Sequence, residues 1–330
     1  MQSSGNKFLL SFLAFGVLFF LLSMQYGETP SAQPSRDAFN PGKNAASATK
    51  DTSLTLPSPP TTPASVGNIA LENYSLRQET ATHWKLAKRL REISGLTWTP
   101  DNRLLAHDDE KAIVFEIDFQ NGSIAKAFAL SDLKKPVADD FEGIAAVEDQ
   151  IYLVTSAGRL YECREGADGQ TVLFNMYTTG IGRDCEIESL AYEPGQRALL
   201  MMCKTPLSLE QKGRLSIYRW SIDTHQLVAD AQIAIPIADL ARPIKAEKFQ
   251  PSGIERHPVS GNYFVVAARQ VAIAEITPSG QVVAVVKFPA DWHRQIEGIT
   301  FAADHTLIIS DEGAGKRARL TLYPLSHSID

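Results

Sequence analysis

The stretch QIEGITFAADHTLIISDE, residues 295–312, carries the pattern that decides the fold. Its opening pentapeptide has four similar copies upstream: EISGL at 92–96, DFEGI at 140–144, EIESL at 186–190 and QPSGI at 250–254. The five copies start 48, 46, 64 and 45 residues apart. A strand-rich repeat with a period in the forties is typical of propeller blades. We therefore predict an all-β fold, a β-propeller of five blades.

Short β-type runs follow each copy, and turn sequences such as PDN, EPGQ and HPVSGN separate them, which predicts four strands per blade. The last copy is followed by enough sequence for only three strands. The segment 83–90, just before the first copy, can supply the fourth, so that an N-terminal strand closes the ring and leaves no open sheet edge. The alternative is a sixth, degenerate blade in the 64-residue interval, but that interval is too short for two full blades.

The first residues predict a membrane segment. An uncharged run rich in Phe and Leu spans 8–24 after Lys7, and its 17 residues are at the lower limit for a membrane-spanning helix. A retained anchor and a cleavable signal peptide both fit this pattern, and both imply export. We expect residues 1–26 to form a cytoplasmic tip and a single transmembrane anchor in the inner (cytoplasmic) membrane.

The chain after the anchor divides in two. Residues 27–68 are rich in Ser, Thr, Pro and Ala, which predicts a disordered tether. Residues 69–330 contain the repeats and are expected to form the propeller domain on the periplasmic side. The net charge of -6 and pI of about 5.7 argue against a nucleic-acid partner, which would require clustered Lys and Arg.

The repeat starts, together with the runs RLLAHDDE (103–110) and TLIISDE (306–312), resemble the SdiA-regulated family of bacterial exported proteins over roughly residues 80–325. This resemblance implies a propeller, an N-terminal membrane segment and a location in the cell envelope. The family is more loosely similar to the esterase-like phytase and paraoxonase propellers. The resemblance implies no particular reaction.

The repeat symmetry brings acidic residues together. The third residue of each motif should lie at one height around the channel axis, at the same end where the second strands finish; these residues are Ser94, Glu142, Glu188, Ser252 and Glu297. We predict that Glu142, Glu188 and Glu297 bind a hard divalent cation, calcium, through carboxylate oxygens. The alternative is that each Glu caps a strand start or pairs with a neighbouring Lys or Arg.

Further charged residues are expected at the same mouth of the channel. The predicted ligand-binding residues are Glu92, Asp108, Lys204, Arg269 and Asp311, with the acids in the first and last blades and the bases in the third and fourth. The seven histidines are scattered, and neither an HExxH nor a CxxC motif supports a zinc site. No GxSxG motif supports a serine hydrolase.

Two functions remain open. The first is a binding module that presents the mouth to a small anionic ligand or an envelope protein. The second is a metal-dependent hydrolase of esters, lactones or phosphoesters, for which His107 and His293 are the candidate bases that could activate water.

Because the chain has three cysteines, at least one of them cannot take part in a disulfide within the chain. Cys185 and Cys203 become near neighbours across a predicted hairpin, so a disulfide and a pair of buried thiols are both consistent with the sequence.

Overall fold

The computed structural model describes residues 70–326 except 134, 208 and 290. The predicted membrane segment at 8–24 and the predicted tether at 27–68 lie outside these residues. Within the described part of the chain, no helix is long and apolar enough to span a bilayer.

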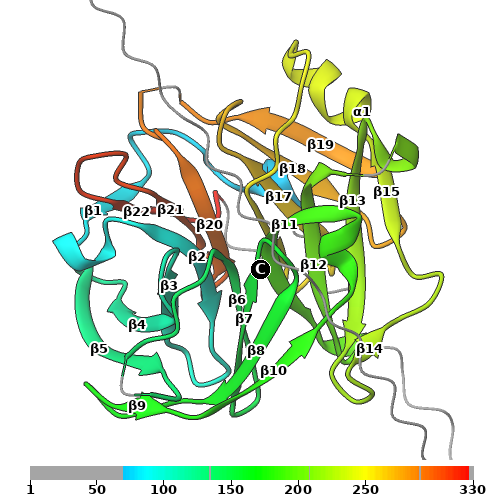
Figure 1. Cartoon of the computed structure of the whole chain (residues 1–330). Helices are drawn as coiled ribbons and strands as arrows, with labels where there is room; N and C mark the ends of the chain where they lie inside the picture. Colours follow the sequence, from blue (N-terminus) through cyan, green and yellow to red (C-terminus); the bar gives the residue numbers. More distant parts are fainter. Residues whose placement is uncertain (1–69, 134, 208, 290, 327–330) are drawn as a thin grey trace, which may run out of the picture. The chain divides into compact units, whose positions relative to one another are not determined.

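The described residues form five antiparallel sheets, which are the five blades of a propeller (Figure 1). Blade 1 contains β2 (Ile93–Trp98), β3 (Leu104–Asp108), β4 (Ile113–Asp118) and β5 (Ser123–Leu130), with β9 (Thr171–Val172) added parallel to β5. Blade 2 contains β6 (Phe141–Val147), β7 (Gln150–Thr155), β8 (Arg159–Arg164) and β10 (Phe174–Thr178). Blade 3 contains β11 (Cys185–Glu193), β12 (Ala198–Pro206) and β13 (Arg214–Ser221), and both β14 (Gln226–Leu227) and β15 (Ile233–Pro236) pair with β13.

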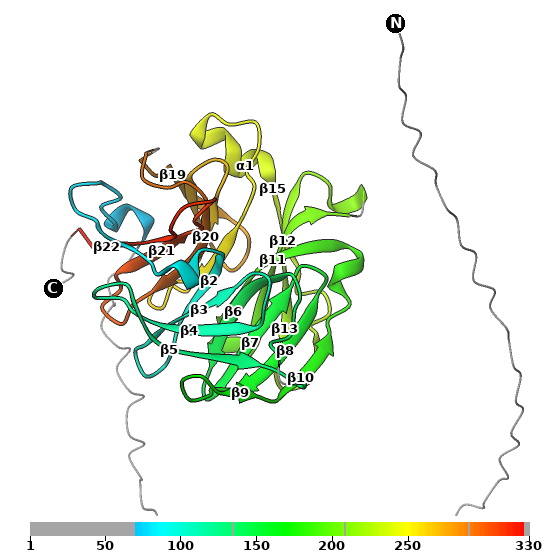
Figure 2. The same ribbon diagram turned by 60° about the vertical axis from the view of Figure 1, so that its left-hand side comes forward.

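Blade 4 contains β16 (Gly253–Arg256), β17 (Tyr263–Ala267), β18 (Ala272–Ile276) and β19 (Val282–Lys287). Blade 5 contains β20 (Ile296–Phe301), β21 (Leu307–Asp311), β22 (Arg319–Tyr323) and β1 (Thr82–Lys85). The one α-helix of the described residues, α1 (Ile237–Ala241), lies beside β15 and β19 (Figure 2). This helix, the one-turn helix η6 (Arg242–Ile244) and the long strands β11 and β12 account for the longer third interval of the repeat.

The ring closes as the sequence predicted. Strand β1 pairs antiparallel with β22, with Trp84 opposite Leu320, so the N-terminal strand completes the last blade. The strand occupies Thr82–Lys85, at the beginning of the predicted segment, and residues Lys88–Leu90 form a one-turn helix instead. The inner strands β2, β6, β11, β16 and β20 contact one another in order, and β20 contacts β2. Five blades rather than six are confirmed.

The burial of each strand explains its pattern of apolar and polar residues. The second strands of the blades, such as β17 and β21, are buried along their whole length, because neighbouring blades cover both faces of each sheet. The sequence of β17 is accordingly a continuous apolar run, and that of β21 is apolar up to Ser310 and Asp311, which are buried polar residues. The outer strand β19 is only partly covered and exposes Val283 and Val286. The core therefore consists of apolar layers between adjacent blades. The inner strands surround the channel axis.

The N-terminal residues are also part of the packed domain. Leu71 and Tyr74 are buried in the same apolar cluster as Phe264 and Phe301. The Tyr74 hydroxyl is 3.0 Å from His257 Nε2, and the Leu71 amide donates to Glu275. These contacts join the chain before β1 to blades 4 and 5.

Candidate functional site

Four of the five inner strands, all except β16, have the same local irregularity at their start. In β6 the ladder partners run from Phe141 directly to Gly143, which leaves Glu142 without a partner as a β-bulge. Ser94, Glu188 and Glu297 are skipped in the same way in their strands. A bulge redirects the side chain of the extra residue. The recurring motif is therefore a bulge that places one polar side chain at the mouth of the channel.

The glycine that follows the third motif residue in every blade except blade 3 allows close packing between blades. A Cβ atom on Gly143 would lie 2.4 Å from the backbone nitrogen of Leu190 in the next inner strand. On Gly253 a Cβ atom would lie 2.7 Å from the carbonyl oxygen of Glu297. The absence of a side chain thus allows neighbouring inner strands to approach each other, and this approach brings the bulged residues together.

Two bulged residues of blade 3 form an ion pair. Lys204, the residue skipped in β12, places its Nζ 2.7 Å from Oε1 of Glu188. The Glu188 side chain is 3% exposed, and its Oε2 atom has no hydrogen-bond partner. A buried carboxylate oxygen without a donor is costly, so this atom marks a position where a ligand would be stabilised.

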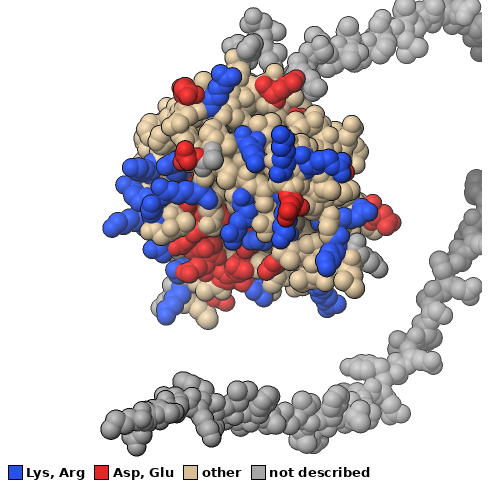
Figure 3. Space-filling model, turned by 90° about the horizontal axis from the view of Figure 1, so that it is seen from above, with Lys and Arg blue, Asp and Glu red and all other residues tan. Residues whose placement is uncertain are grey.

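Two adjoining cavities occupy the mouth. The first, which we call the acidic cavity, has a volume of about 160 Å³ and is lined by six carboxylates: Asp109, Asp140, Glu142, Glu188, Glu297 and Glu312. The second, the arginine cavity, has a volume of about 370 Å³ and is lined by Gln250, Ser252, Arg269 and Arg294 among others. Glu188, Lys204, Gln295 and Glu297 line both. Acidic side chains also gather in a patch bordered by Lys and Arg on the face shown in Figure 3.

Three carboxylates of the acidic cavity, those of Glu142, Glu188 and Glu297, hold their protons unusually tightly. Burial, reinforced by the charge of Glu188, raises the pKa of Glu142 to about 9. Burial raises the pKa of Glu188 to about 8, although Lys204 opposes this shift. For Glu297, burial and the nearby acids raise the pKa to about 7. Carboxylates with such perturbed pKa values in a cavity are characteristic of functional sites.

The rim of the acidic cavity has a second carboxylate group. Burial raises the pKa of Glu312 to about 7, and a hydrogen bond shared with Glu92 raises it further. Burial and the charges of Asp108 and Glu92 raise the pKa of Asp109 to about 6, and its Oδ1 atom is buried without a partner. Asp109 and Glu312 line the cavity. Glu92 does not line it; it interacts with both of these residues and also pairs with Arg91.

The other predicted ligand-binding residues have different outcomes. Lys204 and Arg269 line the arginine cavity as expected. Asp108 lies at the end of β3, where its carboxylate accepts the backbone N–H of Glu110, and it lines neither cavity. Asp311 also lines neither cavity; it is 3% exposed and faces the interior of blade 5. The placements of Asp108, Asp311 and Glu92 therefore differ from the sequence-based prediction.

Asp311 instead belongs to a buried network beneath the mouth. Its Oδ2 atom is 2.7 Å from His293 Nδ1, and His293 Nε2 is 2.7 Å from the Tyr323 hydroxyl. The Oδ1 atom accepts the backbone N–H groups of Arg294 at 2.9 Å and Gln295 at 3.3 Å. Asp311 is therefore a positioning residue, because it fixes the backbone from which Arg294 and Gln295 extend into the cavities.

Neither histidine considered as a base reaches the mouth. His293 is 2% exposed and fully engaged in the network of Asp311. His107 is completely buried, its Nε2 atom has no hydrogen-bond partner, and burial lowers its pKa to about 4. The expectation that one of them activates water at the mouth is not met by this geometry.

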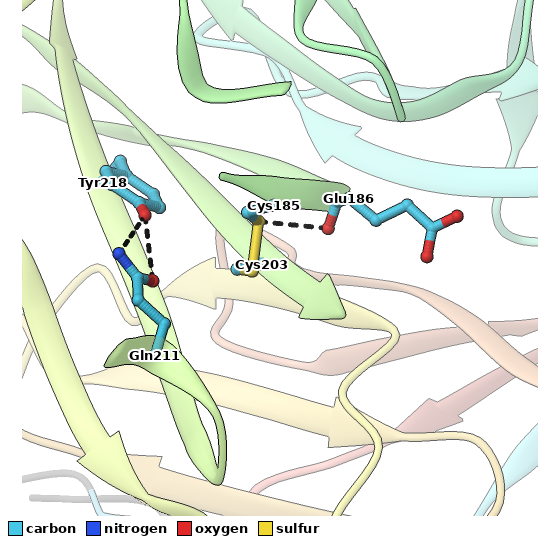
Figure 4. Close-up of a disulfide and its surroundings, with 5 residues drawn as sticks. All are labelled: Cys185, Glu186, Cys203, Gln211 and Tyr218. Atoms are coloured by element: carbon cyan, nitrogen blue, oxygen red, sulfur yellow. Dashed lines mark hydrogen bonds between the residues drawn. A yellow bond between two sulfur atoms is a disulfide. The ribbon is translucent and has the colours of Figure 1, made fainter. Parts of the chain in front are cut away.

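The Cys185–Cys203 pair is joined by a disulfide with a Cα–Cα distance of 5.7 Å (Figure 4). It connects the start of β11 to β12 one residue before Lys204, so it supports the strand ends that carry Glu188 and Lys204. Cys163 is a free, buried thiol, as expected for a core position.

Comparison with known proteins identifies the architecture but no family. No protein-family model matches the chain, and no curated protein matches it. The glutaminyl cyclase of Myxococcus xanthus superposes with a TM-score of 0.50 at 13% sequence identity, covering 74% of this chain and 95% of that one. A luciferin-regenerating enzyme (TM-score 0.47, 9% identity, 71% and 91% coverage) and a streptogramin B lyase (0.42, 13%, 73% and 97%) are also similar.

These similarities show the fold alone. The SdiA-regulated family is not confirmed by them. At such low identity the reactions named for these propellers do not transfer to this chain.

The described residues include no group of three or more His, Cys, Asp or Glu side chains already arranged to hold a metal ion. The oxygen donors of the acidic cavity nevertheless suit calcium better than zinc. In the observed arrangement the Lys204 ammonium group supplies the positive charge next to Glu188.

Proposed function

We propose that this protein is an envelope binding module that holds a small anionic ligand at the propeller mouth, together with a calcium ion in the acidic cavity. The observation that carries the proposal is the shared wall of the two cavities, where Glu188, Lys204 and Glu297 lie between the other four carboxylates of the acidic cavity and a pair of arginines.

The acidic cavity supports the cation. Its carboxylates repel one another, and the raised pKa values of Glu142, Glu188 and Glu297 measure the cost of ionising them. A divalent cation would offset this repulsion and provide a partner for the free Oε2 atom of Glu188. Since Lys204 occupies the other oxygen, we expect calcium to displace its ammonium group toward the arginine cavity.

The arginine cavity supports the anionic ligand. Arg269 and Arg294 both line it, and neither forms an ion pair with any described residue. Guanidinium groups bind carboxylates and phosphates with paired N–H donors. A ligand whose acidic group contacts these arginines would lie within reach of the proposed cation across the shared wall.

The positions of the two histidines favour binding over hydrolysis with a histidine base. Such a hydrolase would need His107 or His293 near the bound water, and both are buried away from the cavities. The alternative partner, an envelope protein, would cover the same mouth.

The envelope location rests on two independent features. The apolar run at 8–24 predicts export, and the disulfide between Cys185 and Cys203 is typical of an oxidising compartment. An alkaline phosphatase fusion after residue 70 should be active, and a cytoplasmic reporter at the same point should be silent. The opposite pair of results would overturn the location.

The binding proposal is tested by calorimetric titration of the purified protein with calcium, together with elemental analysis. We expect saturable binding that is lost in the Glu188→Gln/Glu297→Gln variant and retained in Glu72→Gln, which changes an exposed acid outside the mouth. If the wild-type protein contains no metal and does not respond to millimolar calcium, the acids serve only as paired or protonated strand-start residues.

A further inference from the structure

A third cavity lies at the other end of the channel. It has a volume of about 170 Å³, and we call it the distal cavity. All five inner strands contribute to it with residues near their ends, whereas the mouth is formed by residues near their starts. The distal cavity shares no lining residue with the acidic cavity or the arginine cavity. It is therefore a separate candidate site.

Glu255 is the acidic residue that lines the distal cavity. Its Oε1 atom accepts the backbone N–H of Arg256 at 2.8 Å, and its Oε2 atom accepts the Thr300 hydroxyl at 3.3 Å. No described Lys, Arg or His side chain forms an ion pair with it. The guanidinium group of Arg256 lies instead beside Gly261 in the following turn. A carboxylate in this position lacks a counter-ion.

The remaining wall of the distal cavity is aromatic. Trp98, Tyr192 and Phe301 come from three different inner strands and surround the same space as Glu255. The Trp98 ring is held edge-to-face against Phe119 at a centroid distance of 5.1 Å. The faces of aromatic rings attract cations, and a nearby carboxylate adds to this attraction. The same carboxylate disfavours an anion.

We propose that the distal cavity binds a small organic cation, an ammonium compound of a few heavy atoms, with Glu255 as its counter-ion and the three aromatic side chains as its walls. The limited volume excludes drug-sized ligands, which need several hundred Å³. The single carboxylate favours a monovalent ammonium group over a divalent metal ion, which takes several oxygen ligands. This site does not depend on the proposed calcium site at the mouth.

The protonation of Glu255 gives the site a characteristic pH dependence. Burial raises the pKa of Glu255 to about 8, so this side chain is largely protonated at pH 7 when no ligand is bound. A cation binds the ionised form, and binding therefore releases a proton. The other charged or titratable groups lining the same cavity are Arg256, whose charge opposes the rise in the pKa of Glu255, and Tyr192, whose own pKa is raised by burial. Because the ionised fraction of Glu255 increases about tenfold between pH 7 and pH 9, the affinity should increase by the same factor.

The probe for this proposal is tetramethylammonium chloride, titrated into the full-length protein at pH 7 and pH 9 and compared with sodium chloride at equal ionic strength. We expect saturable binding by calorimetry or by NMR, about tenfold tighter at pH 9. The Glu255→Gln variant should lose both the binding and its pH dependence, and Trp98→Leu should weaken binding at both pH values. Glu148→Gln removes an exposed carboxylate at the same end of blade 2 and should bind as the wild type does.

The outcomes separate this site from the mouth. If Glu255→Gln is poorly folded, Thr300→Val provides a second variant, because it removes one hydrogen bond to the carboxylate and should change the pH at which the affinity rises. Binding of tetramethylammonium that persists in Glu255→Gln, or no saturable binding at either pH, would overturn the proposal. Calcium titration of Glu255→Gln should match the wild type, so failure at the mouth and failure at the distal cavity are distinguishable.

Discussion

Lys204 Nζ lies 2.7 Å from Glu188 Oε1, and both residues are bulges that the β11–β12 ladder skips. Because each is displaced from its regular strand position, their side chains meet at the wall between the two cavities. The pair leaves the second oxygen of Glu188 without a partner. Lys204 therefore neutralises only part of the acidic cavity.

This pairing predicts the effect of replacing the lysine. In Lys204→Met the positive charge that competes with calcium at Glu188 is gone, so calcium affinity should increase about tenfold, equivalent to about 1.4 kcal/mol. Calorimetric titration measures the change, and Lys212→Met, an exposed lysine in a turn, is the control. Equal or weaker calcium binding in Lys204→Met would mean that the ammonium group does not compete with a cation.

The buried acids predict that the metal-free protein loses stability between pH 7 and pH 9. Glu142, Glu188 and Glu297 have folded-state pKa values of about 9, 8 and 7, all above the ordinary value of 4.5. In this range the unfolded chain has already released these protons while the folded protein retains some of them, so the free energy of unfolding decreases as pH rises. Each group that stays protonated contributes a slope of about 1.4 kcal/mol per pH unit.

Urea unfolding in EDTA at several pH values measures this slope. The window starts at pH 7 because His107 and His257, whose pKa values burial lowers to about 4, affect stability only at lower pH. Glu142→Gln mimics the protonated acid and should flatten the decrease, whereas Glu72→Gln should not. A wild-type protein whose stability is constant from pH 7 to pH 9 would contradict the prediction.

The sequence predicted the fold more completely than it predicted which side chains line the mouth, and the difference has a physical reason. The motif repeats revealed the five blades, the closing strand and the convergence of Glu142, Glu188 and Glu297, because all of these follow from symmetry. The bulges do not follow from strand periodicity. Asp311 was expected at the mouth because it ends a second strand, but the end of a strand does not determine to which side its last side chain points. The side chain of Asp311 faces the interior of blade 5.

Other site residues had weaker signals in the sequence. Arg294 lies in the segment before the last motif, and only its position next to that motif could have indicated it. Glu255 lies at the far end of an inner strand, where the repeats share no common residue type. Its role depends on aromatic side chains from three other strands, and such a grouping requires the three-dimensional structure.

The close approach of inner strands predicts the cost of adding one methyl group. In Gly143→Ala the new Cβ atom would lie 2.4 Å from the Leu190 backbone nitrogen, so blades 2 and 3 must move apart. We expect a loss of about 1–3 kcal/mol in the free energy of unfolding. Gly195→Ala is the matched control, since its Cβ atom would meet no atom within 4 Å. Equal stability of the two variants would show that the inner strands of blades 2 and 3 can accommodate the added methyl group without a loss of stability.

The disulfide predicts a specific thiol pattern. Non-reducing mass spectrometry of the exported protein should find a peptide pair linking Cys185 to Cys203, and Cys163 should react with an alkylating agent only after unfolding, because it is buried. The bond encloses a sequence separation of 18 residues, so reduction should cost about 3 kcal/mol of stability. Free thiols at both positions in freshly isolated protein would contradict the disulfide and weaken the case for an oxidising compartment.

The Asp311 network predicts a variant that affects both stability and binding. Ionised Asp311 only accepts hydrogen bonds, so Nδ1 of His293 donates to it, and Nε2 is then free to accept from the Tyr323 hydroxyl. Asp311→Ala leaves the imidazole N–H and the backbone N–H groups of Arg294 and Gln295 without their acceptor. Since these groups are largely buried, the free energy of unfolding should fall by about 3 kcal/mol.

Asp311→Asn separates positioning from stability. The amide oxygen of Asn can still accept the Arg294 and Gln295 N–H groups, so the loop should keep its conformation, but the contact with His293 loses its charge. We expect a smaller stability loss of about 1–2 kcal/mol and near wild-type binding of an anionic probe, inorganic phosphate, at the arginine cavity, whereas Asp311→Ala should bind phosphate more weakly even where it remains folded. Asp304→Ala, an exposed turn residue of the same blade, controls for the loss of a negative charge. If Asp311→Ala and Asp311→Asn bind phosphate equally well, Asp311 stabilises blade 5 without positioning Arg294.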